Sequence, residues 1–171
     1  DLRRWDIVVE DSAGKRLSLC VPGRFLSLLC DAVDANFAPL RLLSLLKHPY
    51  CAGGMNPIHF RHFVEQIELV ALRGPRPGDG LPAVAAALDD AELRHFFETH
   101  VIANLAALID CWQVPNPTLA SLSEGIAEAA ERLCATVMDS NDGGADRGAG
   151  AIELWKGADG MAASDLFRSL A

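Results

Sequence analysis

The sequence contains no complete catalytic motif. Gly14 and Lys15 match the end of a phosphate-binding loop, but Val9 occupies the position of that loop's first glycine, and Arg16 follows the lysine. No serine stands in a Gly-x-Ser-x-Gly turn, which carries the nucleophile of many hydrolases. We therefore expect no catalytic residues in this chain, neither of a nucleotide hydrolase nor of a serine hydrolase.

Aromatic residues are scarce and long apolar runs are absent. Only 6% of the 171 residues are aromatic, while half are hydrophobic, with many leucines and alanines, which favours helix over sheet. No apolar run approaches the roughly 20 residues that cross a bilayer, so we expect no membrane contact. A chain of this length buries roughly 70% of its unfolded surface in one core. The start at Asp1, without a charged and apolar leader, predicts an internal piece of a longer protein.

The cysteines lack the spacing of a metal or redox site. They are five in number, and no Cys-x-x-Cys pair occurs among them, which argues against a zinc ribbon and a thioredoxin-type site. Most have apolar neighbours, so we expect reduced, buried thiols in a cytoplasmic protein. The cysteines are Cys20, Cys30, Cys51, Cys111 and Cys134.

Acidic residues are missing between Asp34 and Glu65, although the whole chain has a net charge of −8. The overall charge argues against a free-standing nucleic-acid-binding protein, which usually has a basic excess. The acid-free stretch nevertheless contains Arg41, Lys47 and Arg61. Two interpretations remain open, namely a local basic patch on an acidic body and chance spacing on a solvated surface.

Residues 40–49 predict a mostly buried helix with a narrow cationic stripe. Five leucines fill seven positions, and Arg41, Ser44 and Lys47 are three residues apart, which places them on one side of a helix. Pro39 suits the first turn of this helix, and Pro49 prevents its continuation.

The rest of the chain predicts a mainly α, multi-helix domain with short extended segments near its N-terminus. Residues 1–20 contain a β-branched run, a turn and an alternating stretch, which predict extended segments that enter the domain. Residues 21–139 form the helical core domain, and Gly125 within it permits close helix packing. Residues 140–150 have the composition of a flexible loop. Residues 151–171 form a terminal segment and a helix that packs back on the core.

One histidine pair raises the alternative of an independent metal-dependent enzyme. His59 and His62 are three residues apart on the helix predicted for residues 57–72, and Glu65 and Glu68 continue the row. A third ligand at the usual spacing is missing, and a solvated polar face explains the same pattern. We expect no metal site.

Residues 42–49, Leu-Leu-Ser-Leu-Leu-Lys-His-Pro, resemble the Leu-Leu-x-Leu-Leu-Lys-His-Pro signature of the AddB family. AddB proteins are the partner subunits of the AddAB helicase–nuclease, which acts in bacterial double-strand break repair. Further features are similar to the alphaproteobacterial branch of that family, in the same order along nearly the whole chain. They are Trp5 with Ile-Val-Val after it, Asp11-Ser12-Ala13-Gly14, the loop of residues 72–77, and Leu154-Trp155-Lys156-Gly157 with Asp159-Gly160.

The resemblance implies an internal fragment of a helicase-like region. Its fold is then a helical accessory domain like the insertion in helicases related to UvrD and RecB. The nuclease lies elsewhere in such proteins, and the iron–sulfur cluster of some members flanks that nuclease, so we expect no cofactor here. The implied partners are an AddA-type helicase–nuclease subunit and DNA, the latter bound weakly or only within the full complex.

Two functions follow for the fragment. The first is a non-catalytic accessory domain that contributes to DNA handling and subunit assembly, because phosphate contacts need little more than positive charge. The alternative is a purely structural protein–protein interaction domain without direct DNA contact. The candidate DNA-binding residues are Arg41, Lys47, His48, Arg61, Arg73 and Arg76.

Overall fold

Helices build the part of the chain that the structure, a computed structural model, describes, namely residues 16–73, 77–137 and 149–170. The expectation of a mainly α fold is confirmed, and these residues form no strand, only one isolated bridge between Met55 and Thr136. The helices are α1 (Val21–Asp34), α2 (Pro39–Leu46), α3 (Pro57–Ile67), α4 (Leu81–Ala86), α5 (Ala91–Phe97), α6 (Ala103–Gln113), α7 (Leu119–Cys134), α8 (Ala149–Trp155) and α9 (Gly157–Leu170). A 3₁₀ turn, η2 (Leu17–Leu19), and two π-helical turns, η3 (Glu68–Leu72) and η4 (Glu98–Ile102), complete the set.

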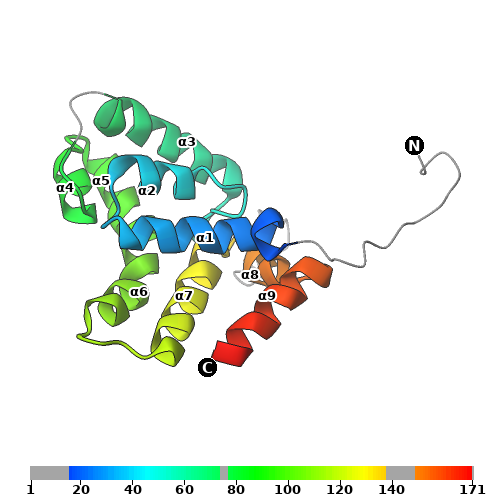
Figure 1. Ribbon diagram of the computed structural model, residues 1–171. Helices are drawn as coiled ribbons and strands as arrows, with labels where there is room; N and C mark the ends of the chain where they lie inside the picture. The colour runs from blue at the N-terminus through cyan, green and yellow to red at the C-terminus, as the bar shows by residue number, and fades with distance from the viewer. Residues whose placement is uncertain (1–15, 74–76, 138–148, 171) are drawn as a thin grey trace, which may run out of the picture.

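Helix α1 runs across the middle of the molecule. In Figure 1, α2 and α3 lie on one side of it, and α6, α7 and α9 lie on the other. Its seven buried residues include Phe25, Leu26 and Leu29, so the helix contributes to the core on both sides. Surfaces on α2 and α3 are thereby separated from those on α7 and α9.

The first described residues correct one expectation. The alternation of residues 17–19 predicts an extended segment, but they form η2, in which the Cys20 N–H donates to the Leu17 carbonyl at 2.9 Å. Tertiary packing explains the difference, because the Leu17 carbonyl lies directly against Gly23, where a Cβ would not fit. The remaining residues of the predicted extended segments, 1–15, lie outside the described part of the chain.

The turn between α1 and α2 also differs from expectation. The sequence predicts that Asn36 ends α1 and that it can also cap α2. Asn36 does lie in the turn that ends α1, but the N-cap of α2 is Ala38, which makes no side-chain bond. Asn36 and Phe37 have positive φ values of 47° and 51°, and the Phe37 N–H donates to the Ala32 carbonyl at 2.6 Å. The Phe37 ring is buried, and this burial stabilises the left-handed turn at the end of α1. Asn36 therefore belongs to the end of α1.

Two long helical runs each contain a π-helical turn. The first, over 57–72, is α3 followed by η3, and Asn56 caps it by accepting the Ile58 N–H at 2.9 Å. The second, over 91–112, is the run of α5, η4 and α6, which Asp90 caps by accepting two backbone N–H groups. A π turn inserts one residue into the helical repeat, so each helix changes the face that it buries.

Helices α6 and α7 form the most extensive contact in the fold. Gly125 makes it possible, because a Cβ there would overlap the Cys111 sulfur and lie 3.5 Å from the Leu108 Cα. The suggestion that Gly125 permits close packing is therefore confirmed. The five cysteines are thiols rather than disulfides, in agreement with the prediction of reduced cysteines, and three of them are buried.

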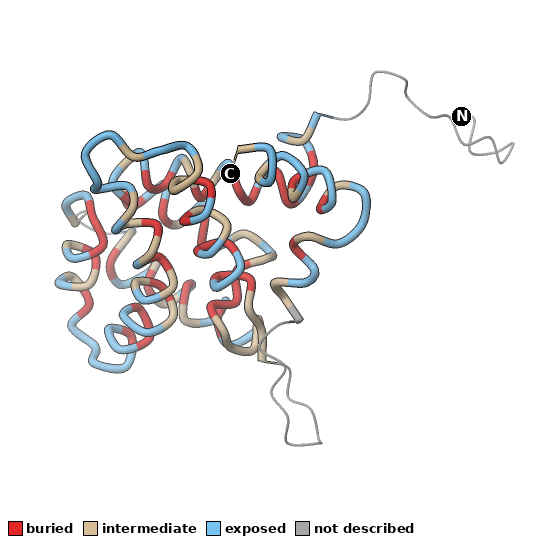
Figure 2. The backbone as a smooth tube through the Cα atoms, turned by 90° about the horizontal axis from the view of Figure 1, so that it is seen from below, coloured by how far each residue is buried: buried red, intermediate tan, exposed pale blue. Residues whose placement is uncertain are grey.

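The C-terminal helices lie against α1 and α7. Helix α8 contacts α7, and α9 contacts both α1 and α7. Most of the predicted loop of residues 140–150 lies outside the described part, and residues 149 and 150 already belong to α8. Figure 2 shows the buried backbone on the inner sides of the helices and the exposed backbone on their outer sides.

Candidate cationic surface on α2, α3 and η3

The leucine-rich helix α2 has the predicted two faces. Leu42, Leu45 and Leu46 are buried, whereas Arg41 and Lys47 are exposed. Leu40 is an exception, because at the start of the helix it is turned to solvent. At a rise of about 1.5 Å per residue, the two cations are about 9 Å apart along the helix axis. The stripe is therefore a surface feature on a well-packed helix.

Lys47 and Arg73 converge on a single carboxylate, that of Glu68. Lys47 forms an ion pair with one carboxylate oxygen, and the Arg73 Nε and Nη2 groups both donate to the other at 3.2 Å. The side chain of Glu68 is only 13% exposed, so the two cations cover it. Lys47, which belongs to the acid-free stretch of the sequence, therefore lies next to an acidic residue from outside that stretch.

The π turn η3 explains this arrangement. In an α-helix, residues three and four apart are neighbours, but a π turn brings together residues that are five apart. The Arg73 N–H donates to the Glu68 carbonyl at 2.9 Å, and the side chains of the same two residues are also hydrogen-bonded. Sequence reasoning placed Glu68 in a row with His59 and His62 and missed its partners, because the π turn leaves no simple sequence signal.

The ion pairs lower the pKa of Glu68 from its ordinary value. The hydrogen bond from Lys47 is the largest cause, and the contact with Arg73 acts in the same direction, while burial opposes both. Glu68 therefore remains ionised in mildly acidic solution, and it neutralises part of the positive charge of this surface.

Arg61 and Lys47 line the same small cleft. The cleft has a volume of about 240 Å³ and is also lined by Leu46, Val64 and Glu65. Arg61 is exposed on α3 and forms no ion pair with any described residue. Two cations from different helices therefore line one hollow together with Glu65, and only Lys47 of the two cations forms an ion pair with a described residue.

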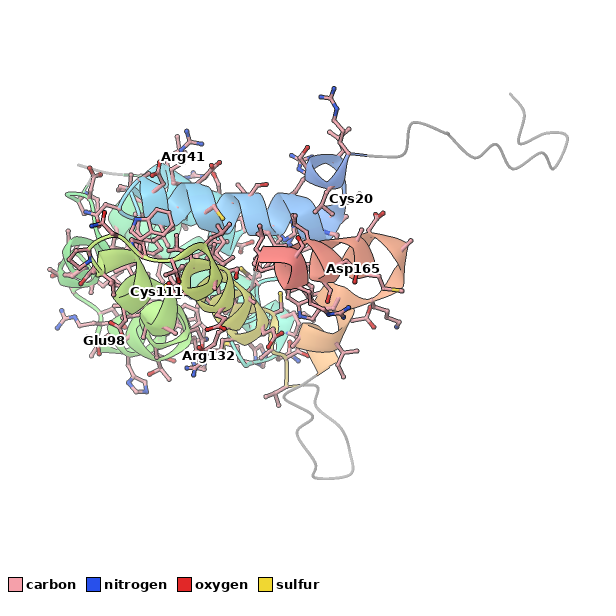
Figure 3. The ribbon with its side chains drawn as sticks, turned by 60° about the horizontal axis from the view of Figure 1, so that its bottom comes forward. Cys20, Arg41, Glu98, Cys111, Arg132 and Asp165 are labelled. Carbon is pink, nitrogen blue, oxygen red and sulfur yellow. The ribbon has the colours of Figure 1, made fainter. Side chains whose placement is uncertain are left out.

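Arg41 lies apart from this cleft. In Figure 3 it projects outward from α2. Its Nη1 lies 3.9 Å from a carboxylate oxygen of Asp31 on α1, and both side chains are more than half exposed. Such an exposed and long ion pair contributes little to stability, so Arg41 is available to other anions.

His48 is not part of the exposed stripe. Its ring packs against Phe25, with centroids 5.0 Å apart, and against Tyr50 at 5.4 Å. The Tyr50 N–H donates to its Nδ1 at 3.3 Å. Burial, and to a smaller extent the nearby Arg24, lowers the pKa of His48, so the ring is neutral near pH 7.

The remaining candidate residues are the histidine pair on α3 and Arg76. The described residues contain no group of three or more metal-ligand side chains, and the His62 Nε2 lies 2.6 Å from the Gln66 Nε2. His59 and His62 thus have no third ligand within these residues. Arg76 lies outside the described part of the chain.

Comparisons with protein-family models, with curated proteins and with solved structures gave no match. The helices in the described ranges are all too short or too polar to cross a bilayer. The structure by itself shows a mainly helical domain with a cationic surface that Glu68 partly neutralises.

Proposed function

We propose that the chain is a non-catalytic accessory domain of a cytoplasmic helicase–nuclease that repairs DNA double-strand breaks. The AddB-like signature in residues 42–49 motivates the class of protein. The position of Lys47 and Arg61 on one cleft is the observation that supports a direct DNA contact. Two cations on neighbouring helices can hold one phosphate group or two adjacent ones, and this requires no base recognition.

This contact is weak in the isolated chain. Lys47 is paired with Glu68, so a phosphate must compete with a carboxylate that is already in place. The net charge of −8 adds a general repulsion of DNA. The surface therefore acts within the complete complex, where an AddA-type subunit holds the DNA close to it.

A titration tests the phosphate contact. The full 171-residue chain is titrated into labelled duplex and single-stranded DNA at about 50 mM salt, where we expect weak binding that decreases further as salt is added. Lys47→Glu weakens binding because it reverses a charge at the cleft. Lys156→Glu is the matched control, since Lys156 is an exposed lysine that is paired with Glu153 away from the cleft. The contact is refuted if the two variants lose affinity equally, or if neither DNA is bound and Lys47→Glu in the full complex leaves unwinding unchanged.

A second candidate function is a protein-interaction domain that does not contact DNA. A large apolar groove on the other side of α1, lined by α7 and α9 among others, favours it. Co-purification with an AddA-type subunit in the presence of nuclease tests this candidate. A complex that survives removal of DNA, together with no DNA binding by the chain alone, supports this candidate over the first.

A further inference from the structure

A small hollow lies where α7, α8 and α9 meet. Its volume is about 330 Å³, which is at the small end of the range of ligand pockets. Each of the three helices contacts the other two, and in Figure 1 α7 and α9 lie side by side with α8 near their upper ends. Helices α7 and α9 supply most of the lining, and Trp155 at the end of α8 completes it.

Two aromatic rings line the hollow. The ring centroids of Trp155 and Phe167 are 5.9 Å apart, and the ring planes are inclined at 61°. Both side chains are half-buried, so part of each ring remains accessible. The face of an aromatic ring attracts organic cations, because the ring quadrupole is negative there.

A hydrogen bond holds a carboxylate beside the indole ring. The Trp155 Nε1–H donates to the Glu131 Oε1 at 2.8 Å, and Glu131 lines the hollow. The indole is neutral, so this bond orients the carboxylate without removing its charge. The carboxylate also retains lone pairs for a second donor.

A second carboxylate, that of Glu124, lines the hollow from the same side of α7. Glu124 lies seven residues before Glu131, which is about 10 Å along the helix axis. The small side chain of Ala127 lies between them in the lining. Within the described residues, Glu124 forms no ion pair.

Arg168 also lines the hollow, but its guanidinium group is paired with a different carboxylate. Its Nη1 donates to Asp165 at 2.9 Å, and its Nη2 donates to the Ser164 hydroxyl at 3.1 Å. Glu124 and Glu131 therefore bring two negative charges to the hollow, and neither has a cationic partner among the described residues. The lining complements a ligand with two positive charges that are separated by an apolar chain.

We propose that this hollow binds an aliphatic polyamine. One ammonium group pairs with Glu131 beside the ring of Trp155, and another pairs with Glu124. The methylene chain between them lies over Ala127 and against Phe167. An extended triamine such as spermidine is long enough to join the two carboxylates, whereas a monoamine reaches only one. The site goes beyond the proposed DNA contact, because none of its residues belongs to α2, α3 or η3.

Calorimetric titration of the full 171-residue chain at low salt tests the proposal. The probes are spermidine, butylamine and magnesium ion. We expect one spermidine per chain with a dissociation constant below about 1 mM, and at least about tenfold weaker binding of butylamine. Magnesium has the charge but no methylene chain, so it does not displace spermidine at equal concentration.

Three isosteric substitutions on α7 separate a site from general attraction to an acidic protein. Glu131→Gln retains an acceptor for the indole N–H but removes the charge, and Glu124→Gln removes the other charge. We expect about threefold weaker spermidine binding from each and about tenfold from both together. Glu128→Gln is the matched control, because Glu128 is exposed on the same helix, is paired with Arg132 and does not line the hollow. It leaves the affinity unchanged, and circular dichroism confirms that the variants are folded.

Four results would overturn the proposal. They are the absence of saturable spermidine binding, equal affinities for spermidine and butylamine, displacement of spermidine by magnesium at equal concentration, and equal losses in Glu128→Gln and Glu131→Gln. The last two would show attraction to the net negative charge of the chain rather than a site. Failure of DNA binding at Lys47 leaves the spermidine result unaffected, so the two proposals fail independently.

Discussion

The close packing of α6 on α7 predicts that the effect of Gly125→Ala on stability depends on residue 111. The substitution destabilises the protein when residue 111 is cysteine and stabilises it when residue 111 is alanine. Gly125 lies inside α7, where alanine is normally more favourable than glycine by about 0.5–1 kcal/mol. In this protein the added methyl group overlaps the Cys111 sulfur, which is held by a hydrogen bond to the Leu108 carbonyl at 3.2 Å. Overpacking of this kind costs about 1–3 kcal/mol. We therefore expect Gly125→Ala to lower the free energy of unfolding by about 1 kcal/mol.

The same substitution stabilises the protein when Cys111 is replaced by alanine. Without the sulfur, the next contacts of the new methyl group are the Leu108 Cα at 3.5 Å and the Ala107 carbonyl oxygen at 3.6 Å, which are ordinary packing distances. Gly125→Ala then raises the free energy of unfolding by about 0.5–1 kcal/mol, and the coupling energy is about 2 kcal/mol.

Urea unfolding, followed by circular dichroism, measures the four free energies of this double-mutant cycle. Gly78→Ala is the control, because its nearest neighbour would be the Ala83 Cβ at 3.8 Å, and its effect adds to that of Cys111→Ala. Stabilisation by Gly125→Ala in the wild-type background, or the same effect in both backgrounds, would refute the packing argument.

Three further predictions concern individual residues. The pKa of Glu68 is lowered from 4.5, so its ion pairs stabilise the fold at neutral pH, and this contribution disappears as the pH falls through the folded-state pKa. The stability lost in Glu68→Gln is then fully present at pH 7 and decreases as the pH falls through the folded-state pKa, and a loss that does not change with pH would contradict it. Asn56→Ala removes the cap of α3 and lowers the free energy of unfolding by about 1 kcal/mol, measured by urea unfolding, whereas no change would show that the cap is not needed. Burial raises the pKa of Cys51 and Cys134, so these thiols react with a disulfide reagent only as the protein unfolds, whereas the partly exposed Cys30 reacts sooner. Equal rates at all three cysteines would contradict this order.

Local signals in the sequence predicted most of the helices. Prolines and caps mark the starts of α2, α3 and α5, and the leucine spacing of α2 predicted its buried face. These features depend on neighbours in the chain, so the sequence contains them directly. The 3₁₀ turn at residues 17–19 and the start of α2 at Ala38 rather than Asn36 were missed, since packing against Gly23 and burial of Phe37 decide them.

The candidate site was less accessible to sequence reasoning. The three-residue spacing of the polar side chains predicts the cationic stripe of α2. It does not predict the ion pair that neutralises Lys47, because Glu68 is 21 positions away in the sequence and comes close only in the fold. Similarly, the apolar groove is assembled from η2 and four helices, and the helix faces that line it resemble ordinary core periodicity. The pattern along the chain does not show which distant residues come together in the fold.

The salt dependence of DNA binding tests the central proposal most directly. If Lys47 and Arg61 replace about two counterions, affinity for duplex DNA falls about twelvefold between 50 and 200 mM salt. Lys47→Gln with Arg61→Gln removes both contacts, so the dependence on salt nearly vanishes. Lys156→Gln with Arg132→Gln removes the same number of positive charges from paired surface positions and preserves the dependence. An unchanged slope in the first variant, or an equal loss in the second, would contradict the account.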